Sequence, residues 1–188
     1  MQNFLIRTLD VVLSLFGIIF SLPVMLLVYF LSLFLQGSPL YFQQRVGKDK
    51  NLFTLMKFRT MAHHTESVGT HLVDSTSITR LGQFLRKTKL DELPQLFNVL
   101  LGSMSLVGPR PCLPNQAELI EEREKRDVFK VRPGITGLAQ VNGVDMSIPR
   151  KLARYDQLMI QHMCLKLYFK LIITTAFGKG RGDRVRIA

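Results

Sequence analysis

A long apolar segment near the amino terminus constrains this chain more than any other feature. Residues 11–35 contain no charged side chain and few polar ones. About 20 consecutive apolar residues are enough for a helix to cross the hydrocarbon core of a bilayer. The segment is too long for the core of a secretory signal peptide, and it lacks a small-residue cleavage site. We therefore expect residues 1–36 to form a hydrophobic membrane helix.

A proline in the middle of this segment predicts a break in the helix. Pro23 has no backbone N–H and its ring clashes with the preceding turn, so we expect a kink there. Ser21 is close enough to bond a carbonyl that the kink frees. Positive residues occur on both flanks, with Arg7 before the segment and Arg45 after it. Because positive residues prefer the cytoplasm, a bent helix that enters and leaves the same leaflet competes with a straight span. The residues alone leave both arrangements open.

The rest of the chain carries the whole excess of positive charge. The formal net charge is +11 and the isoelectric point is about 10.1. Residues 1–36 contribute only Arg7 and Asp10 to this balance. Such an excess suits an anionic membrane surface, a nucleic acid or a phosphorylated substrate. The two cysteines, Cys112 and Cys164, have no metal-ligand spacing, which indicates free thiols in a reducing compartment.

The residues beyond the apolar segment predict a small hairpin and several helices. Two β-like runs, 40–44 and 52–58, are joined by a polar connection that contains glycine, so we expect them to pair. Residues 61–77 are typical of a polar loop, and the histidines in it have no convincing metal spacing. Residues 148–163 predict an amphipathic helix. Residues 165–177 are too few to cross a bilayer but suit a helix that lies in its interface.

Two adjacent carboxylates, Asp91 and Glu92, lie where a new helix is expected to begin. Thr88 is a possible cap, Pro94 suits a first helical turn, and Gly102 ends the apolar run that follows. A helix that begins near Asp91 places both acids beside unpaired backbone N–H groups, which favours their ionised forms and attracts phosphate. The basic residues around the pair are Arg80, Arg86, Lys87, Lys89 and Arg110. The spacing alone is compatible with a satisfied ion-pair cluster and with a phosphate-handling site.

Several sequence blocks occur in an order that is typical of one family. The blocks are Phe42-Gln-Gln-Arg45-Val-Gly47, Lys57-Phe-Arg-Thr-Met61, Leu81-Gly-Gln-Phe-Leu-Arg86, Leu90-Asp-Glu-Leu-Pro-Gln-Leu-Phe-Asn-Val-Leu100, Met104-Ser-Leu-Val-Gly-Pro-Arg-Pro111 and Arg132-Pro-Gly-Ile-Thr-Gly-Leu-Ala-Gln-Val141. Because it carries these blocks in this order, the chain resembles the small monotopic phosphoglycosyl transferases, also called bacterial sugar transferases. The resemblance covers nearly its whole length. Each block by itself is weak evidence for the family. All the blocks occurring in the order typical of the family are very unlikely to match by chance.

The resemblance implies a mainly α fold with small β elements (α+β). It divides the chain into a re-entrant membrane helix at 1–36, a cytosol-facing catalytic domain at 37–177 and a basic flexible tail at 178–188. The catalytic domain includes the interfacial amphipathic helix at 165–177. In the family the membrane helix breaks at a serine-proline pair; here Leu22 separates Ser21 from Pro23.

The resemblance also implies an activity and its residues. The family moves a sugar 1-phosphate from a UDP-sugar to polyprenyl (undecaprenyl) phosphate and releases UMP, at the cytosolic face of the bacterial inner membrane. This reaction is the first membrane step of glycan assembly. By resemblance, Asp91 is the nucleophile that forms a phosphosugar-aspartate intermediate, and Glu92 is the partner of Mg²⁺. Arg86 matches a family arginine, Asp156 falls at a family-like position, and the other candidate phosphate-binding residues are Arg59, Arg110 and Arg132.

Two other hypotheses compete with this one. The first is a non-enzymatic, membrane-tethered basic module that binds acidic lipid or nucleic acid. This hypothesis explains the net charge but not the two adjacent acids. The chain lacks a basic motif interleaved with aromatic residues, so we expect no nucleic-acid partner. The second keeps the enzyme but makes residues 1–36 a true span. The sequence determines neither the sugar, the pathway, the polyprenol length nor the oligomeric state.

Overall fold

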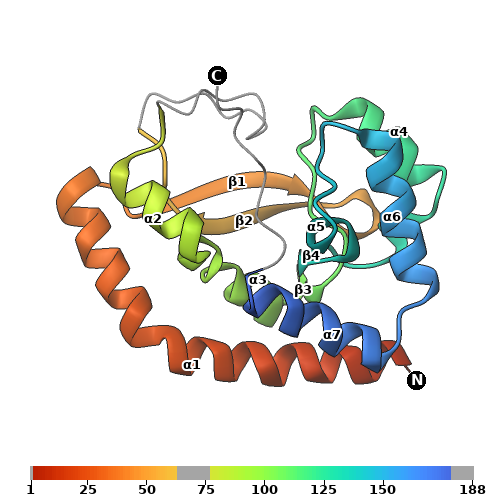
Figure 1. Ribbon diagram of the computed structural model, residues 1–188, viewed down its shortest axis with the longest axis horizontal. Helices are drawn as coiled ribbons and strands as arrows, with labels where there is room; N and C mark the ends of the chain where they lie inside the picture. Colours follow the sequence, from red (N-terminus) through yellow and green to blue (C-terminus); the bar gives the residue numbers. More distant parts are fainter. Residues whose placement is uncertain (1, 63–76, 179–188) are drawn as a thin grey trace.

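The computed structural model describes residues 2–62 and 77–178, and it is mainly helical with two small sheets (Figure 1). The predicted fold class, mainly α with small β elements, is confirmed. The helices are α1 (Gln2–Gln36), α2 (Arg80–Thr88), α3 (Gln95–Leu101), α4 (Ala117–Glu124), α5 (Leu138–Val141), α6 (Pro149–Gln161) and α7 (Leu165–Ala176). The predicted histidine loop and basic tail lie outside the described residues, apart from their end residues.

Two pairs of strands lie inside this framework. β1 (Leu40–Val46) and β2 (Leu52–Phe58) pair antiparallel, with Leu40 opposite Phe58 and Val46 opposite Leu52. A 3-10 turn, η1 (Lys48–Lys50), joins them, so the predicted hairpin is confirmed. β3 (Ser105–Val107) and β4 (Gly134–Thr136) pair in parallel, which the sequence did not predict because each strand is only three residues long.

The amino-terminal helix α1 is long, apolar and bent. Figure 1 shows that its first half runs along α3 and α7, and that its second half turns to run beside α2. The bend lies near the middle of the helix, where Pro23 is located. The hydroxyl of Ser21 donates to the carbonyl of Gly17 at 2.6 Å. The carbonyl that loses a donor to Pro23 is that of Ile19, four residues before the proline, so the predicted role of Ser21 at the kink is wrong.

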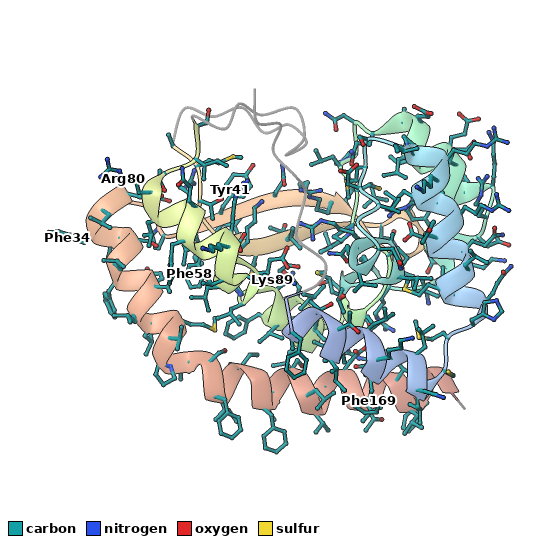
Figure 2. The ribbon with its side chains drawn as sticks, viewed as in Figure 1. Phe34, Tyr41, Phe58, Arg80, Lys89 and Phe169 are labelled. Carbon is teal, nitrogen blue, oxygen red and sulfur yellow. The ribbon has the colours of Figure 1, made fainter. Side chains whose placement is uncertain are left out.

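Most of the surface of α1 is apolar and exposed. Phe20 and Phe34 are 78% and 88% exposed, and Figure 2 shows Phe34 projecting away from the molecule. In the part of the chain that the structure describes, α1 is the one helix long and apolar enough to cross a membrane, and only 22% of its most apolar window is buried. Large apolar surfaces of this kind mark membrane or partner contacts.

Hydrogen bonds attach both ends of α1 to the folded domain. At the amino-terminal end, Arg7 donates from Nη1 to the carbonyl of Val99 at 2.8 Å and from Nη2 to that of Leu100 at 3.1 Å. Both carbonyls belong to the last turn of α3, where guanidinium groups commonly satisfy free acceptors. At the other end, Gln36 Nε2 donates to Thr79 Oγ1 at 3.2 Å. Both ends of α1 are therefore bonded to the same folded domain.

A buried carboxylate adds a third attachment of α1. Asp10 is 2% exposed, and its Oδ1 accepts from Ser105 Oγ at 3.0 Å, from Leu106 N at 2.9 Å and from Tyr168 OH at 2.8 Å. Three donors compensate a charge that would otherwise be costly to bury. Because Ser105 and Leu106 lie on β3 and Tyr168 on α7, this one side chain joins three elements.

The carboxyl-terminal helices follow the predictions from the sequence. The expected helices at 148–163 and 165–177 are observed as α6 and α7. Tyr168 and Leu171 of α7 are buried against Met159 of α6 and against the first half of α1. Lys89, at the end of α2, donates from Nζ to the carbonyl of Thr175, which places α7 beside the segment with the two acids (Figure 2).

Candidate active site

The segment around Asp91 and Glu92 is a tight turn, not the start of a helix. Helix α2 ends at Thr88, Lys89 adopts a left-handed conformation (φ 60°), and a 3-10 turn, η4 (Leu90–Glu92), follows before α3 begins at Gln95. The hydroxyl of Thr88 donates to the carbonyl of Phe84 at 2.8 Å. The prediction that Thr88 caps a helix beginning near Asp91 is therefore wrong. The left-handed residue turns the chain before a new helix can form.

Two of the backbone N–H groups that the sequence predicted as free donors beside the acids are bonded within this turn. The N–H of Glu92 donates to the carbonyl of Lys89 at 3.2 Å, and that of Leu93 donates to Leu90 at 3.3 Å. These groups satisfy each other within the turn. The electrostatics around the two acids therefore depend on side chains from other elements. The predicted end of α3 at Gly102, which has a φ of 93°, is confirmed.

Glu92 forms an ion pair with Arg110, which belongs to a different segment of the chain. Arg110 Nη1 lies 3.1 Å from Glu92 Oε1, and the two side chains are 22% and 17% exposed. Arg110 stands between Pro109 and Pro111, just after β3. The prolines limit the backbone freedom of this turn and so restrict where the guanidinium points. The structure thus brings together two residues that the sequence predicted as site residues.

The environment of Asp91 raises its pKa, in contrast to the prediction from the sequence that the ionised form is favoured. Burial and the neighbouring charge of Glu92 raise the pKa of Asp91 to about 6, against the opposing effect of Lys57, Arg86 and Arg110. Burial acts because a carboxylate loses hydration in a low-dielectric site. The expectation of ionised acids rested on an α-helix beginning near Asp91, whereas the structure has a 3-10 turn there and α3 begins at Gln95. A carboxyl group with such a pKa changes its charge near neutral pH.

Lys57 belongs to the same site, although the sequence indicated it only as one of several cations. It lies on β2, opposite Tyr41 of β1, and its Nζ is 5.2 Å from the centre of the Tyr41 ring. Burial and the charges of Arg45 and Arg86 lower its pKa to about 8, while Asp91 acts to raise it. A lysine between two apolar residues of a strand was the signal available in the sequence.

Arg86 is held beside the acids by the close packing of α2 on the hairpin. A Cβ on Gly82 would lie 2.0 Å from the carbonyl oxygen of Thr60, so only glycine permits this approach. One turn further along α2, Arg86 Nε donates to Thr60 Oγ1 at 2.9 Å. The remaining nitrogens of its guanidinium extend the group of cations around Asp91.

Arg59 lies near this group and Arg132 does not. The guanidinium of Arg59 is 5.4 Å from the centre of the Tyr41 ring, and within residues 2–62 and 77–178 its buried Nε has no hydrogen-bond partner. Arg132 Nε donates to the carbonyl of Gly102 at 2.8 Å, at the carboxyl end of α3. The structure therefore places Arg132 at the other end of the helix from the two acids.

Asp156 acts on the site through other residues. It is buried on α6 and pairs with Arg123 of α4, whose Nε and Nη2 lie 3.0 and 2.7 Å from Asp156 Oδ2. Arg123 Nη1 donates to the carbonyl of Arg110 at 2.9 Å. The buried pair thus supports the turn that presents Arg110 to Glu92. Sequence reasoning missed Arg123, which is one of several charged residues in α4.

Two adjacent acids are the available donors for a metal ion. Within the described residues, no group of three or more His, Cys, Asp or Glu side chains is arranged to hold a metal. Mg²⁺ does not need such a cage, because it is commonly held by one or two carboxylates together with water and substrate phosphates. Burial and the charge of Glu92 raise the pKa of Asp91, and a cation bound by these carboxylates would relieve the repulsion between them. The residues present therefore fit the Mg²⁺ that the resemblance implies.

Comparisons with known proteins show the family. The family model for bacterial sugar transferases matches residues 1–180. The chain is 42% identical over 140 residues to the uncharacterized sugar transferase EpsL of Bacillus subtilis, a match covering 74% of this chain and 69% of that protein. It is 39% identical over 162 residues to the undecaprenyl-phosphate galactose phosphotransferase of Salmonella typhimurium, covering 76% of this chain and 33% of that protein. It is 35% identical over 192 residues to the UDP-N-acetylgalactosamine-undecaprenyl-phosphate N-acetylgalactosaminephosphotransferase of Aeromonas hydrophila, covering 94% of this chain and 45% of that protein.

The match to the family model includes both the apolar helix and the segment with the two acids, since it extends from residue 1 to residue 180. The chain spans less than half the length of the Salmonella and Aeromonas proteins. The resemblance that the ordered sequence blocks indicated is confirmed over nearly the whole chain. The protein belongs to the bacterial sugar transferase family.

Proposed function

We propose that this protein transfers a sugar 1-phosphate from a UDP-sugar to undecaprenyl phosphate, with Asp91 as the covalent acceptor. The observation that carries the proposal is the arrangement around Asp91. A half-buried carboxyl with a pKa of about 6 lies next to Glu92, and the charges of Lys57, Arg86 and Arg110 act on it. Three cations suit a dianionic diphosphate. The Salmonella and Aeromonas relatives are named as transferases to undecaprenyl phosphate, which supports the substrate class.

The reaction proceeds in two displacements. In the first, a carboxylate oxygen of Asp91 bonds to the phosphorus next to the sugar, the bond from that phosphorus to the bridging oxygen breaks, and UMP leaves with the bond electrons. In the second, a phosphate oxygen of the polyprenyl phosphate attacks the same phosphorus, and the bond to Asp91 breaks to restore the carboxylate. Two steps allow the soluble and the lipid substrate to bind in turn.

The surrounding side chains provide charge compensation. Lys57, Arg86 and Arg110 offset the charge that develops on the phosphoryl oxygens, which is the main contribution of fixed cations to phosphoryl transfer. Mg²⁺, when bound with Glu92 among its ligands, would neutralise diphosphate charge and stabilise the departing UMP. Arg110 already forms an ion pair with Glu92, so it holds the carboxylate of Glu92 in a defined position.

The attachments of α1 support a re-entrant arrangement. Arg7 and Gln36, near opposite ends of α1, both bond to the same folded domain. A straight span would carry one end of the helix about 30 Å away, across the hydrocarbon core. The bend at Pro23 instead lets the exposed apolar middle of α1 enter one leaflet and return. The protein is thus a bacterial membrane protein whose catalytic domain, we propose, faces the cytosol.

The experiment that tests the activity is UMP release by the detergent-solubilised full chain. It uses undecaprenyl phosphate, Mg²⁺ and a panel of UDP-sugars, because the Salmonella and Aeromonas relatives are named for different sugars. We expect turnover with at least one donor, a phosphosugar adduct on Asp91 and loss of both in Asp91→Asn. Full turnover by Asp91→Asn would exclude the covalent mechanism. The alternative, a non-enzymatic basic module, predicts no UMP release with any donor.

The topology has its own test. Single cysteines are placed at residue 3 and residue 37 in a variant in which Cys112 and Cys164 are replaced by serine, and each is labelled from either side of the membrane. The re-entrant arrangement predicts labelling of both positions from the cytosol. Periplasmic labelling of one position and cytosolic labelling of the other would show a true span.

A further inference from the structure

A cavity of about 310 Å³ lies at the carboxyl end of α3, away from the two acids of the active site. Its walls come from the first turns of α1, from the segment that follows β3 and from the end of α6, and from the 3-10 turn η5 (Val128–Lys130). Neither acid of the active site nor any of the cations around them lines it. Four of its lining residues are basic: Arg7, Lys48, Lys130 and Arg132.

The balance of charge in this cavity is positive. Asp10 is the one acidic residue of its lining, and the Oδ1 atom of Asp10 already accepts three hydrogen bonds from the folded domain. Lys48 lies 3.8 Å from Asp49, and Lys130 lies 3.1 Å from Asp127. All four side chains of these two pairs are strongly exposed, and such pairs contribute little. The lysines therefore remain available to an anion in the cavity.

The two arginines are oriented by the backbone. Arg7 donates to two carbonyls of the last turn of α3, and Arg132 Nε donates to Gly102 at its end. Considering only residues 2–62 and 77–178, the two terminal nitrogens of Arg132 bond to no acceptor. A guanidinium that is held through Nε presents its terminal N–H groups as a fixed fork, which matches the oxygens of a phosphate.

The other wall of the cavity is apolar and adjoins exposed apolar side chains of α1. Ile6 and Met163 line it, and on the same turn of α1 Phe4 and Leu5 are 78% and 44% exposed. A soluble anion needs no such wall, whereas a lipid presents a phosphate next to apolar chains. The volume is at the lower end of the range of roughly 300–1,000 Å³ for small-molecule sites, enough for a lipid headgroup. We propose that this cavity binds the phosphate headgroup of an anionic membrane phospholipid, such as phosphatidylglycerol, at a site separate from the active site.

The test is a binding titration of the detergent-solubilised full chain, followed by native mass spectrometry. The probe is short-chain phosphatidylglycerol, with phosphatidylcholine as the zwitterionic comparison. Lys48→Glu/Lys130→Glu reverses two cavity charges on exposed side chains that hold no other element in place. Lys151→Glu/Arg154→Glu is the matched control, because both residues are exposed on α6, neither lines the cavity, and the change in net charge is the same.

We expect one saturable phosphatidylglycerol per chain, weakened at least about tenfold in the cavity variant and unchanged in the control. Lys48→Gln/Lys130→Gln, which neutralises without reversing the charge, should give a smaller loss in the same direction. Equal weakening by the control, or saturable binding of phosphatidylcholine with the same affinity, overturns the proposal. Displacement of the lipid by equimolar inorganic phosphate identifies a site for soluble anions instead, and displacement by equimolar undecaprenyl phosphate identifies an acceptor site. Either displacement also overturns it. Because the readout is lipid binding, the outcome does not depend on UMP release.

Discussion

The buried pair of Asp156 and Arg123 offers the most discriminating prediction, because its effects on stability and on activity can be separated. Asp156→Leu leaves the guanidinium of Arg123 buried without its partner, and both side chains are only 2% exposed. Breaking a buried ion pair in this way costs about 3–5 kcal/mol. For a chain of this size 1 kcal/mol corresponds to about 2–4 °C in Tm, so we expect a decrease of roughly 6–20 °C.

Replacing both partners separates packing from positioning. Arg123→Met/Asp156→Leu fills the same space with apolar groups, and such replacements of buried pairs are usually neutral or stabilising. We therefore expect a Tm close to that of the unchanged protein. Arg123 no longer donates to the carbonyl of Arg110, however, so the ion pair between Arg110 and Glu92 loses its support. Small misplacements of catalytic groups can cost about a hundredfold in rate, and we expect kcat for UMP release to fall by about ten- to a hundredfold.

Thermal unfolding and UMP release are measured on the same detergent-solubilised samples. The matched control is Lys125→Met, just past the end of α4, which breaks the ion pairs of Lys125 with Glu121 and Glu122. Because Lys125 is exposed, we expect less than about 1 kcal/mol of destabilisation and unchanged turnover. If the double variant recovers both stability and turnover, Arg123 does not position Arg110. If Asp156→Leu leaves Tm unchanged, the pair does not have the buried geometry described above.

Four further predictions concern the acids, Lys57 and the attachment of α1. Since the pKa of Asp91 is raised to about 6 and the nucleophile must be ionised, kcat/KM should fall about tenfold between pH 7 and pH 5, whereas an ordinary aspartate predicts a nearly flat profile. Lys57→Met removes a charge that lowers this pKa, so the acidic limb should move to higher pH, and an unmoved limb would contradict the role of Lys57. Chelation of Mg²⁺ should abolish UMP release without lowering Tm. Glu92→Gln should raise the Mg²⁺ concentration needed for half-maximal rate. If that concentration is unchanged, Glu92 is not a ligand of Mg²⁺. Tyr168→Phe removes one donor to Asp10 and should destabilise the protein by about 1–3 kcal/mol in thermal unfolding, while a neutral effect would show that this hydrogen bond does not anchor α1.

The local features of the fold could be predicted from the sequence because they depend on near neighbours. The apolar run of residues 11–35 determines a long helix that exposes apolar surface, and Pro23 determines where it bends. The alternating runs around a glycine-containing connection determine the hairpin of β1 and β2. Each of these predictions uses residues that are close together in the chain. For the same reason, the ordered sequence blocks were sufficient to indicate the family before any contact was known.

The candidate site was only partly predictable, because its electrostatics join residues that are distant in the chain. Asp91 and Glu92 could be identified as a pair, but the helix end that was expected to ionise them is absent. The pKa of Asp91 depends on burial and on Lys57, Arg86 and Arg110, which come from other segments. The sequence indicated both Arg110 and Arg132 as candidate phosphate-binding residues. Only the structure separates them, since one reaches Glu92 and the other reaches Gly102.

The sequence by itself thus determined a membrane-associated helix, a small hairpin and a family, since short-range patterns carry that information. The tertiary structure decided which charged residues meet. It brought Lys57 to Asp91, assigned Asp156 to the support of Arg110 through Arg123, and tied both ends of α1 to one domain. The physical reason is that a charge interacts over several ångströms through space and responds to burial, and neither its neighbours in space nor its burial follows from its position in the chain.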